Sequence, residues 1–168
     1  MALSRRAFAA LAATLPFLAL PVPARAGGGP ETVLVVVNAD SPASLEVANE
    51  YVRLRDVPAS HVLYLTGVPA APVVPVEGFR EAILRPIEAY LAAEGLADDV
   101  DTIAYSVGFP YGVDFSADVK EAKFEPPQIV SATASLTAMT YLYRHVLAKD
   151  PAAYLSLQAN GYFRKDAR

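Results

Sequence analysis

The stretch Val33–Pro58, VLVVVNADSPASLEVANEYVRLRDVP, determines the expected fold class. Residues 32–37 form a nearly continuous β-branched run without polar alternation, which is typical of a strand buried on both faces. Ser41 and Pro42 then predict a helix start, because serine can accept a hydrogen bond from a free backbone N–H and proline suits the first helical position. Apolar residues recur at helical spacing up to about Asp56, and HVLYL at residues 61–65 predicts a second strand. Strand, helix and strand in this order predict a βαβ unit.

The rest of the chain continues this alternation. We expect a helix over about residues 78–94, kinked at Pro86 and capped by Gly95, a strand over 102–107 and a last helix over 131–148. Residues 66–76 and 108–127 are expected to be loops, with a helical turn considered at 120–125, and residues 149–168 show no clear element. The predicted class is α/β, a three-layer sandwich with a mostly parallel sheet. Because three strands make a narrow parallel sheet, we expect the N-terminal part of a larger domain that is truncated at its C-terminus.

The first 26 residues predict a cleaved export signal, followed by an α/β domain over residues 27–168. They combine a basic start, a mildly apolar middle interrupted by prolines, and a small-residue end. The start resembles the twin-arginine export motif, and the end fits signal peptidase cleavage before Gly27; the residues concerned are Ser4, Arg5, Arg6 and Phe8, then Ala24 and Ala26. An ordinary signal with two arginines by chance is the alternative. The expected partners are the twin-arginine translocase and signal peptidase, the expected location is the bacterial periplasm or medium, and no stable membrane span is expected after cleavage.

Charge and composition exclude several classes of protein. The 168 residues carry a net charge of −4, and loss of residues 1–26 would remove three arginines and give −7. An acidic domain repels phosphate backbones, so nucleic-acid binding is not expected, and the basic cluster of Arg164, Lys165 and Arg168 is too small to change this. The chain has no cysteine, which excludes disulfides, a cysteine nucleophile and thiolate metal ligands. We expect no cofactor.

Polar residues follow the expected strands where an α/β sheet usually binds ligands. In open α/β sheets the ligand lies beyond the carboxyl ends of the strands. The polar residues expected there form a crevice consisting of Asn38, Asp40, Ser41, Ser106 and Tyr111. The residues from Asn38 to Ser41 are equally well explained as the hinge at which a strand becomes a capped helix. The crevice is therefore a hypothesis that depends on topology.

The segment AYSVG at residues 104–108 resembles the nucleophile elbow of α/β-hydrolases, with alanine replacing the first glycine. Pro110 follows at once and prevents the helix that an elbow requires. The only later histidine, His145, lies within an apolar helical pattern and is expected to be packed. The order of elements is also similar to that of caspase-like peptidases, but the catalytic histidine of their third-strand turn and every cysteine are absent.

Two further polar segments are candidate ion sites. The acidic residues Asp114, Asp118, Glu121 and Glu125 do not have the spacing of a calcium-binding loop, and interleaved lysines favour a solvated acidic loop. The small polar residues Ser131, Thr133, Ser135 and Thr137 line the start of the expected last helix, where an anion could bind, but capping explains them as well. We therefore predict no metal site.

Several segments resemble an uncharacterised family of exported bacterial proteins. They are residues 33–65, ILRPIEAYL at 83–91, VDTIAYSVGFPYGV at 100–113 and SATASLTAMTYL at 131–142. The resemblance covers most of residues 33–148 and implies export and an α/β domain, and members of that family continue well past the length of this chain. It implies no catalytic residues.

These observations leave two functions open. The leading one is an exported ligand-binding or otherwise non-catalytic α/β module. The alternative is a hydrolase in which Ser106 or Asp40 acts with further catalytic residues that lie beyond Arg168.

Overall fold

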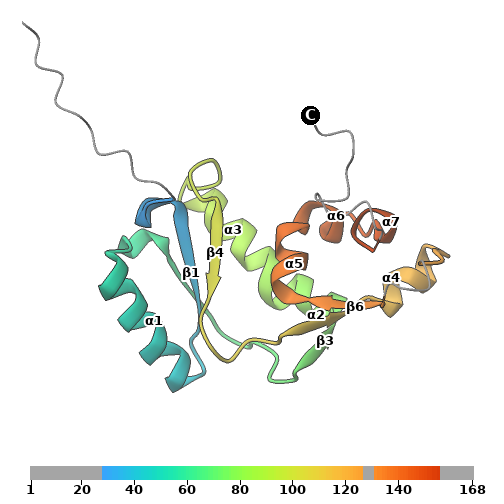
Figure 1. Cartoon of the computed structure of the whole chain (residues 1–168), viewed down its shortest axis with the longest axis horizontal. Coiled ribbons are helices and arrows are strands. Elements are labelled where there is room, and N and C mark those ends of the chain that lie inside the picture. The colour runs from blue at the N-terminus through green and yellow to red at the C-terminus, as the bar shows by residue number, and fades with distance from the viewer. Residues whose placement is uncertain (1–27, 127–130, 156–168) are drawn as a thin grey trace, which may run out of the picture.

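The computed structural model describes residues 28–126 and 131–155 of the chain (Figure 1). The expected export signal and residues 156–168 therefore lie outside the described part. A parallel sheet of three strands forms one half of the molecule, in the order β2 (Val62–Leu65), β1 (Val33–Asn38), β4 (Thr102–Tyr105). This arrangement confirms the predicted α/β class and the parallel βαβ unit. All six residues of β1 are buried, as the unbroken apolar run predicts.

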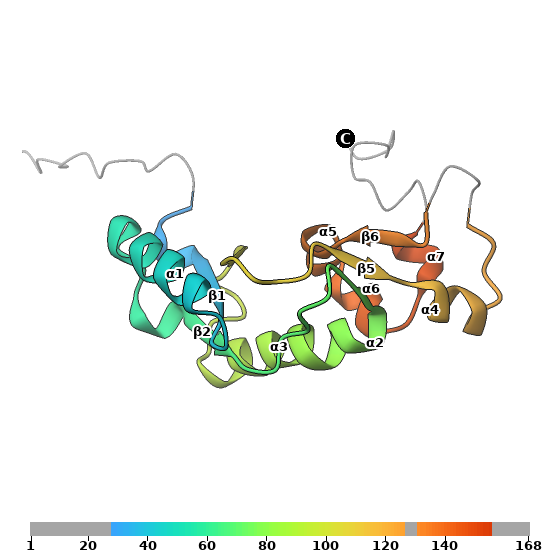
Figure 2. The ribbon, with the colours of Figure 1, turned by 90° about the horizontal axis from the view of Figure 1, so that it is seen from below.

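Helix α1 (Pro42–Arg55) covers one face of this sheet (Figure 2). The Ser41 side chain accepts a hydrogen bond from the backbone N–H of Ser44, so the predicted cap is confirmed. The helix ends at Asp56, which adopts a left-handed conformation with φ of 53°. Under α1 the sheet and helix bury one apolar cluster, which consists of Val33, Val35, Val37, Ala48, Val57 and Val62.

A long interrupted helix covers the opposite face. It consists of α2 (Val76–Phe79), a π-helical turn η3 (Arg80–Leu84) and α3 (Arg85–Ala93). The predicted kink at Pro86 takes the form of this π-helical turn, in which the N–H of Arg85 donates to the carbonyl of Arg80, one residue further back than in an α-helix. Proline has no N–H and its ring crowds the preceding turn, which explains a wider turn just before it. Gly95 ends the helix with φ of 70°, as predicted.

A second small sheet forms the other half of the molecule, and the sequence did not predict it. Strand β5 lies between β3, which is parallel to it, and β6, which is antiparallel. The strands are β3 (Val73–Pro75), β5 (Gly112–Asp114) and β6 (Thr133–Ser135), and the helices beside them are α4 (Ser116–Glu121), α5 (Leu136–Tyr141), α6 (Tyr143–Leu147) and α7 (Pro151–Tyr154). The predicted loops at 66–76 and 108–127 are thus wrong, and α4 begins before the turn considered at 120–125. The single helix expected over 131–148 is a strand and two short helices, and α7 lies where no element was expected.

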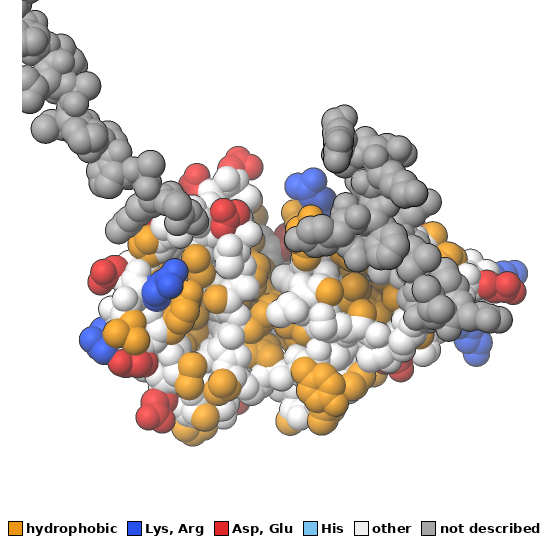
Figure 3. All heavy atoms as spheres, viewed as in Figure 1, with side chains coloured by type: hydrophobic (Ala, Val, Ile, Leu, Met, Phe, Trp, Pro, Cys, Tyr) orange, Lys and Arg blue, Asp and Glu red, His pale blue; other side chains and the backbone are white. Residues whose placement is uncertain are grey.

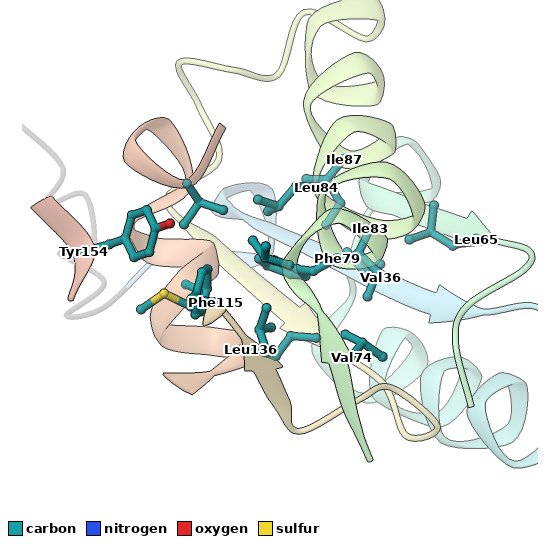
Figure 4. Packing of buried hydrophobic residues seen from close by; sticks show 14 of the residues in the cluster. Val36, Leu65, Val74, Phe79, Ile83, Leu84, Ile87, Phe115, Leu136 and Tyr154 are labelled. Atoms are coloured by element: carbon teal, nitrogen blue, oxygen red, sulfur yellow. The ribbon is translucent and has the colours of Figure 1, made fainter. Parts of the chain in front are cut away.

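One hydrophobic core joins the two halves. Figure 4 shows Val36 and Leu65 of the parallel sheet, Ile83 and Phe79 of the long helix, and Phe115 of the second half in the same cluster.

Two short 3-10 helices, η1 (Pro30–Thr32) and η2 (Ala59–His61), precede β1 and β2. Within the residues that the structure describes, no helix has the length and apolar character needed to cross a membrane.

Candidate functional site

The polar residues at the carboxyl ends of β1 and β4 lie together, as the topology predicts. Asn38 is buried, and its backbone N–H donates to the Ser44 hydroxyl at 3.0 Å. Its side-chain amide donates to the carbonyl of Gly108 at 2.8 Å, and its Oδ1 accepts from the N–H of Asp40 at 3.1 Å. One asparagine therefore fixes the end of β1, the start of α1 and the turn after β4. We call Asn38, Asp40, Ser41, Ser44 and Ser106 the strand-end cluster.

The other members of the strand-end cluster also bond to the protein itself. The Asp40 carboxylate accepts the N–H of Gly67 at 2.6 Å and so joins the ends of β1 and β2. The Ser106 hydroxyl donates to the carbonyl of Ser44 at 2.7 Å. Gly108 has φ of 83°, and a Cβ there would lie 3.3 Å from the Ser41 hydroxyl and 3.4 Å from the Asn38 amide. The cluster thus stabilises the hinge between strand and helix and requires glycine at position 108.

Tyr111, the fifth residue of the predicted crevice, belongs to the other half of the molecule. Its backbone N–H donates to the carbonyl of Pro72, and its carbonyl accepts from the N–H of Leu136, at 3.0 and 3.1 Å. These bonds hold it at the start of β5, and its side chain is 71% exposed. The structure therefore brings four of the five predicted residues together and leaves Tyr111 apart from them.

Within the residues that the structure describes, the strand-end cluster does not have the arrangement that a serine hydrolase requires. A nucleophilic serine needs its hydroxyl in hydrogen-bond contact with a general base. Ser106 instead donates its proton to a backbone carbonyl. His145 is exposed on α6, so the prediction that it is packed is wrong.

The acidic residues after β5 do not form one site. Asp114 accepts hydrogen bonds from the backbone and hydroxyl of Ser116, at 2.9 and 2.6 Å, at the start of α4, while Glu121 and Glu125 are exposed. Asp118 is 3% exposed, so the expected solvated loop is wrong for this residue. No group of three or more histidine, aspartate or glutamate side chains within the described residues is placed to hold a metal ion.

The small polar residues near α5 serve local structure. Ser131 accepts the N–H of Thr133, and Ser135 accepts the N–H of Ala138 as the cap of α5. These bonds correspond to the capping explanation.

Asp118 is part of a buried network that sequence reasoning missed. Arg80 is fully buried, and its guanidinium donates to both carboxylate oxygens of Asp118, to Glu77 at 3.0 Å and to the carbonyl of Val146 at 2.8 Å. The Tyr154 hydroxyl also donates to Asp118. We call these residues the Arg80 network. It connects the long helix with α4, α6 and α7.

The Arg80 network holds its charges by hydrogen bonding. Burial by itself would raise the pKa of Asp118, but the hydrogen bonds from Arg80 and Tyr154 outweigh it and hold the pKa of that carboxyl below its usual value. Burial and the neighbouring Asp118 charge raise the pKa of Tyr154. The network is therefore an ionised pair with a neutral tyrosine, and its contacts join the long helix to helices of the second half.

A groove of about 670 Å³ runs between β4, α3 and the α5–α6 segment. We call it the β4 groove. Its lining residues are Leu84, Ile87, Glu88, Leu91 and Ala92 from the long helix, Ala97, Val100, Asp101, Thr102, Ile103 and Tyr105 from the loop and strand that follow, and Thr137, Thr140, Tyr141 and Tyr143 from α5 and α6. Figure 3 shows a hollow between the two halves of the molecule, with acidic side chains above the side that carries β4.

A few polar groups lie among the apolar residues that line the β4 groove. The Tyr105 hydroxyl bonds to the Thr140 hydroxyl at 2.8 Å, which links β4 to α5, and burial raises the pKa of Tyr105 to about 12. Tyr141, on the opposite side, is 82% exposed. Sequence reasoning missed this groove because Ile87, Leu91 and Tyr143 have the same helical spacing as core residues.

Comparison of the chain with protein-family models, with curated proteins and with solved structures finds no match.

Proposed function

We propose that this chain is a binding module and that its ligand occupies the β4 groove. The observation that carries the proposal is the groove itself. Its volume of about 670 Å³ lies within the range of ligand pockets in proteins, and its walls combine apolar side chains with a few polar groups. The walls come from both halves of the molecule, and sites between two packed units are common places for ligands.

The bonding within the strand-end cluster favours the β4 groove over this cluster as the place of a ligand. Its hydroxyl and amide groups are engaged with backbone groups of the same chain. A ligand there would have to replace those bonds, whereas the β4 groove is an open space that a ligand can enter. The hydrolase alternative gains no support from the contacts of Ser106.

We further propose that the module acts outside the bacterial cytoplasm, after removal of residues 1–26. The support is the sequence pattern around Arg5 and Arg6 and the small residues Ala24 and Ala26. The test is fractionation of cells that express the full chain: we expect a periplasmic or secreted protein beginning at Gly27. Replacing both arginines by lysine should hold the chain in the cytoplasm, and unchanged export would overturn the twin-arginine pathway.

The binding proposal can be tested with a neutral probe and two matched variants. Nile red, an uncharged dye that fluoresces in apolar sites, should bind the full chain. Ala92 and Ala93 are adjacent exposed residues of α3, but only Ala92 lines the groove. Tryptophan at position 92 should fill the groove and weaken dye binding at least about tenfold, or about 1.4 kcal/mol. Ala93→Trp should leave it unchanged.

The outcome separates the groove from other apolar surface. Loss of dye binding in Ala92→Trp alone supports the proposal. Equal binding by the wild type and by Ala92→Trp would show that the groove does not take up the probe, and the proposal would fail. Circular dichroism of both variants checks that they are folded.

A further inference from the structure

Strand β4 is an open edge of the parallel sheet. Among the described residues it pairs with β1 alone. In a parallel ladder, alternate residues direct their backbone N–H and C=O groups to opposite sides, so one set of β4 groups faces away from β1. Natural edge strands are usually protected by a charged residue, by proline or by a covering helix or loop. The strand β4, TIAY, contains no charged residue and no proline. Its outer edge is therefore suited to pair with another strand.

The space for such a strand is the β4 groove. Ile103 and Tyr105 are two positions apart in β4 and therefore lie on the same face of the strand. Both line the groove, together with residues of α3 and of the α5–α6 segment. In Figure 1 the open side of β4 lies over α3 and faces α5. A strand added beside β4 would thus lie on the same helix that already covers β1. Its alternate side chains would enter the apolar wall.

The charge of the groove indicates which kind of strand fits. The described residues that line it include two carboxylates, Glu88 and Asp101, and no lysine or arginine. Asp98 and Asp99 are exposed in the loop just before β4 and add to the same end. Complementary charge attracts and orients a partner, so a basic residue is favoured beside Asp101. A second copy of this acidic chain would bring a net charge of −4 and is less well matched.

We infer that β4 accepts an extended segment of another polypeptide as a fourth strand, with lysine or arginine at the end beside Asp101. This inference rests on the proposed binding function of the β4 groove. Addition of a strand to a sheet edge gives affinity through main-chain hydrogen bonds and specificity through alternate side chains. The matching segment alternates apolar and small polar residues.

The probes are fluorescent peptides with blocked ends, measured by anisotropy with the full chain. Acetyl-KKVTVTV-amide and acetyl-VTVTVKK-amide place two lysines at either end, and the stronger binder reports the direction of the strand. Acetyl-EEVTVTV-amide and acetyl-VTVTVEE-amide are the charge controls and should bind at least about tenfold more weakly. Glu88→Gln combined with Asp101→Asn should remove most of this difference and flatten the salt dependence.

Backbone methylation tests the strand geometry directly. Two further versions of the stronger peptide carry N-methyl groups on the valines or on the threonines. In an edge strand only one of these sets donates to β4, so one version should lose at least about tenfold in affinity and the other should bind nearly as before. Equal affinities of the two versions, or equal affinities of the lysine and glutamate peptides, would overturn the inference.

Three controls separate this inference from its alternatives. Nile red binding that responds to Ala92→Trp, without peptide binding, would leave the proposed function intact and remove only the strand. A dimer in sedimentation equilibrium that Ala92→Trp dissociates would assign the edge to a second copy and overturn the inference. Arg164→Gln, Lys165→Gln and Arg168→Gln together should leave peptide affinity unchanged; a tenfold gain would show that the chain's own basic segment competes, which also overturns it.

Discussion

Replacing Asp118 by alanine should destabilise the protein strongly, because it would leave the Arg80 guanidinium buried without its main partner. Arg80 is fully buried and Asp118 is 3% exposed. Removing one member of a buried ion pair typically costs about 3–5 kcal/mol. Glu77 also accepts a hydrogen bond from Arg80, at 3.0 Å, and its side chain is 56% exposed, so it compensates in part. We therefore expect a loss at the lower end, about 3 kcal/mol of the free energy of unfolding.

Urea unfolding, followed by circular dichroism and by tyrosine fluorescence, measures this loss in a chain that has nine tyrosines and no tryptophan. The thermal midpoint should fall by about 6–12 °C. Glu81→Ala is the control, since it breaks an exposed ion pair with Arg85, which is worth less than about 1 kcal/mol. Equal effects of Asp118→Ala and Glu81→Ala would refute the reasoning. Arg80→Met, Asp118→Leu and Tyr154→Phe together should recover most of the loss, because this apolar set leaves neither a buried charge nor the Tyr154 hydroxyl without its partner.

Three further predictions concern pH, the turn after β4 and Ser106. Because the pKa of Asp118 is lowered in the folded protein, the stability that it contributes is present at neutral pH and is lost as pH falls below about 4; the difference between wild type and Asp118→Asn in urea unfolding should therefore shrink from pH 7 to pH 3, and a constant difference would contradict this. Gly108→Ala should lower the free energy of unfolding by about 1–3 kcal/mol, since the φ of Gly108 is 83° and an added Cβ would crowd Ser41 and Asn38. Gly78→Ala, in an open helical position, should instead raise it by about 0.5–1 kcal/mol. Thermal melts of both variants measure this, and an equal change in both would contradict the prediction. Ser106→Ala should cost about 1 kcal/mol through the lost bond to Ser44 and should leave Nile red binding unchanged, and loss of dye binding would place Ser106 at the ligand.

The first βαβ unit could be predicted from the sequence because its signals are local. The valine run, the Ser41 cap and the helical spacing each act within a few residues, and the structure has β1, α1 and β2 where they indicate. The strand-end cluster followed from topology, since parallel strands bring their carboxyl ends to one edge. Its long-range hydrogen bonds, such as that from Asn38 to Gly108 over 70 positions, carry no local signal.

The second half was missed for the same physical reason. Strands β3, β5 and β6 have three residues each, too few to show a period, and their pairing is wholly long-range. Arg80 has a sequence context that also fits an exposed helical residue, and its burial depends on Asp118 and Val146, which lie 38 and 66 positions away. The β4 groove was missed because a filled core and an open groove need the same apolar residue types.

The shared core has a consequence for how the molecule responds to heat and to ligands. The cluster around Phe79 contains side chains of both halves, so the two sheets share one core. The two halves should therefore unfold in a single cooperative transition, with coincident melting curves from backbone and tyrosine signals. Since the β4 groove lies between them, any occupant binds only while both halves are folded, and its affinity adds to the stability of the whole chain as RT ln(1 + [L]/Kd). The groove thus makes melting temperature a direct measure of its occupancy.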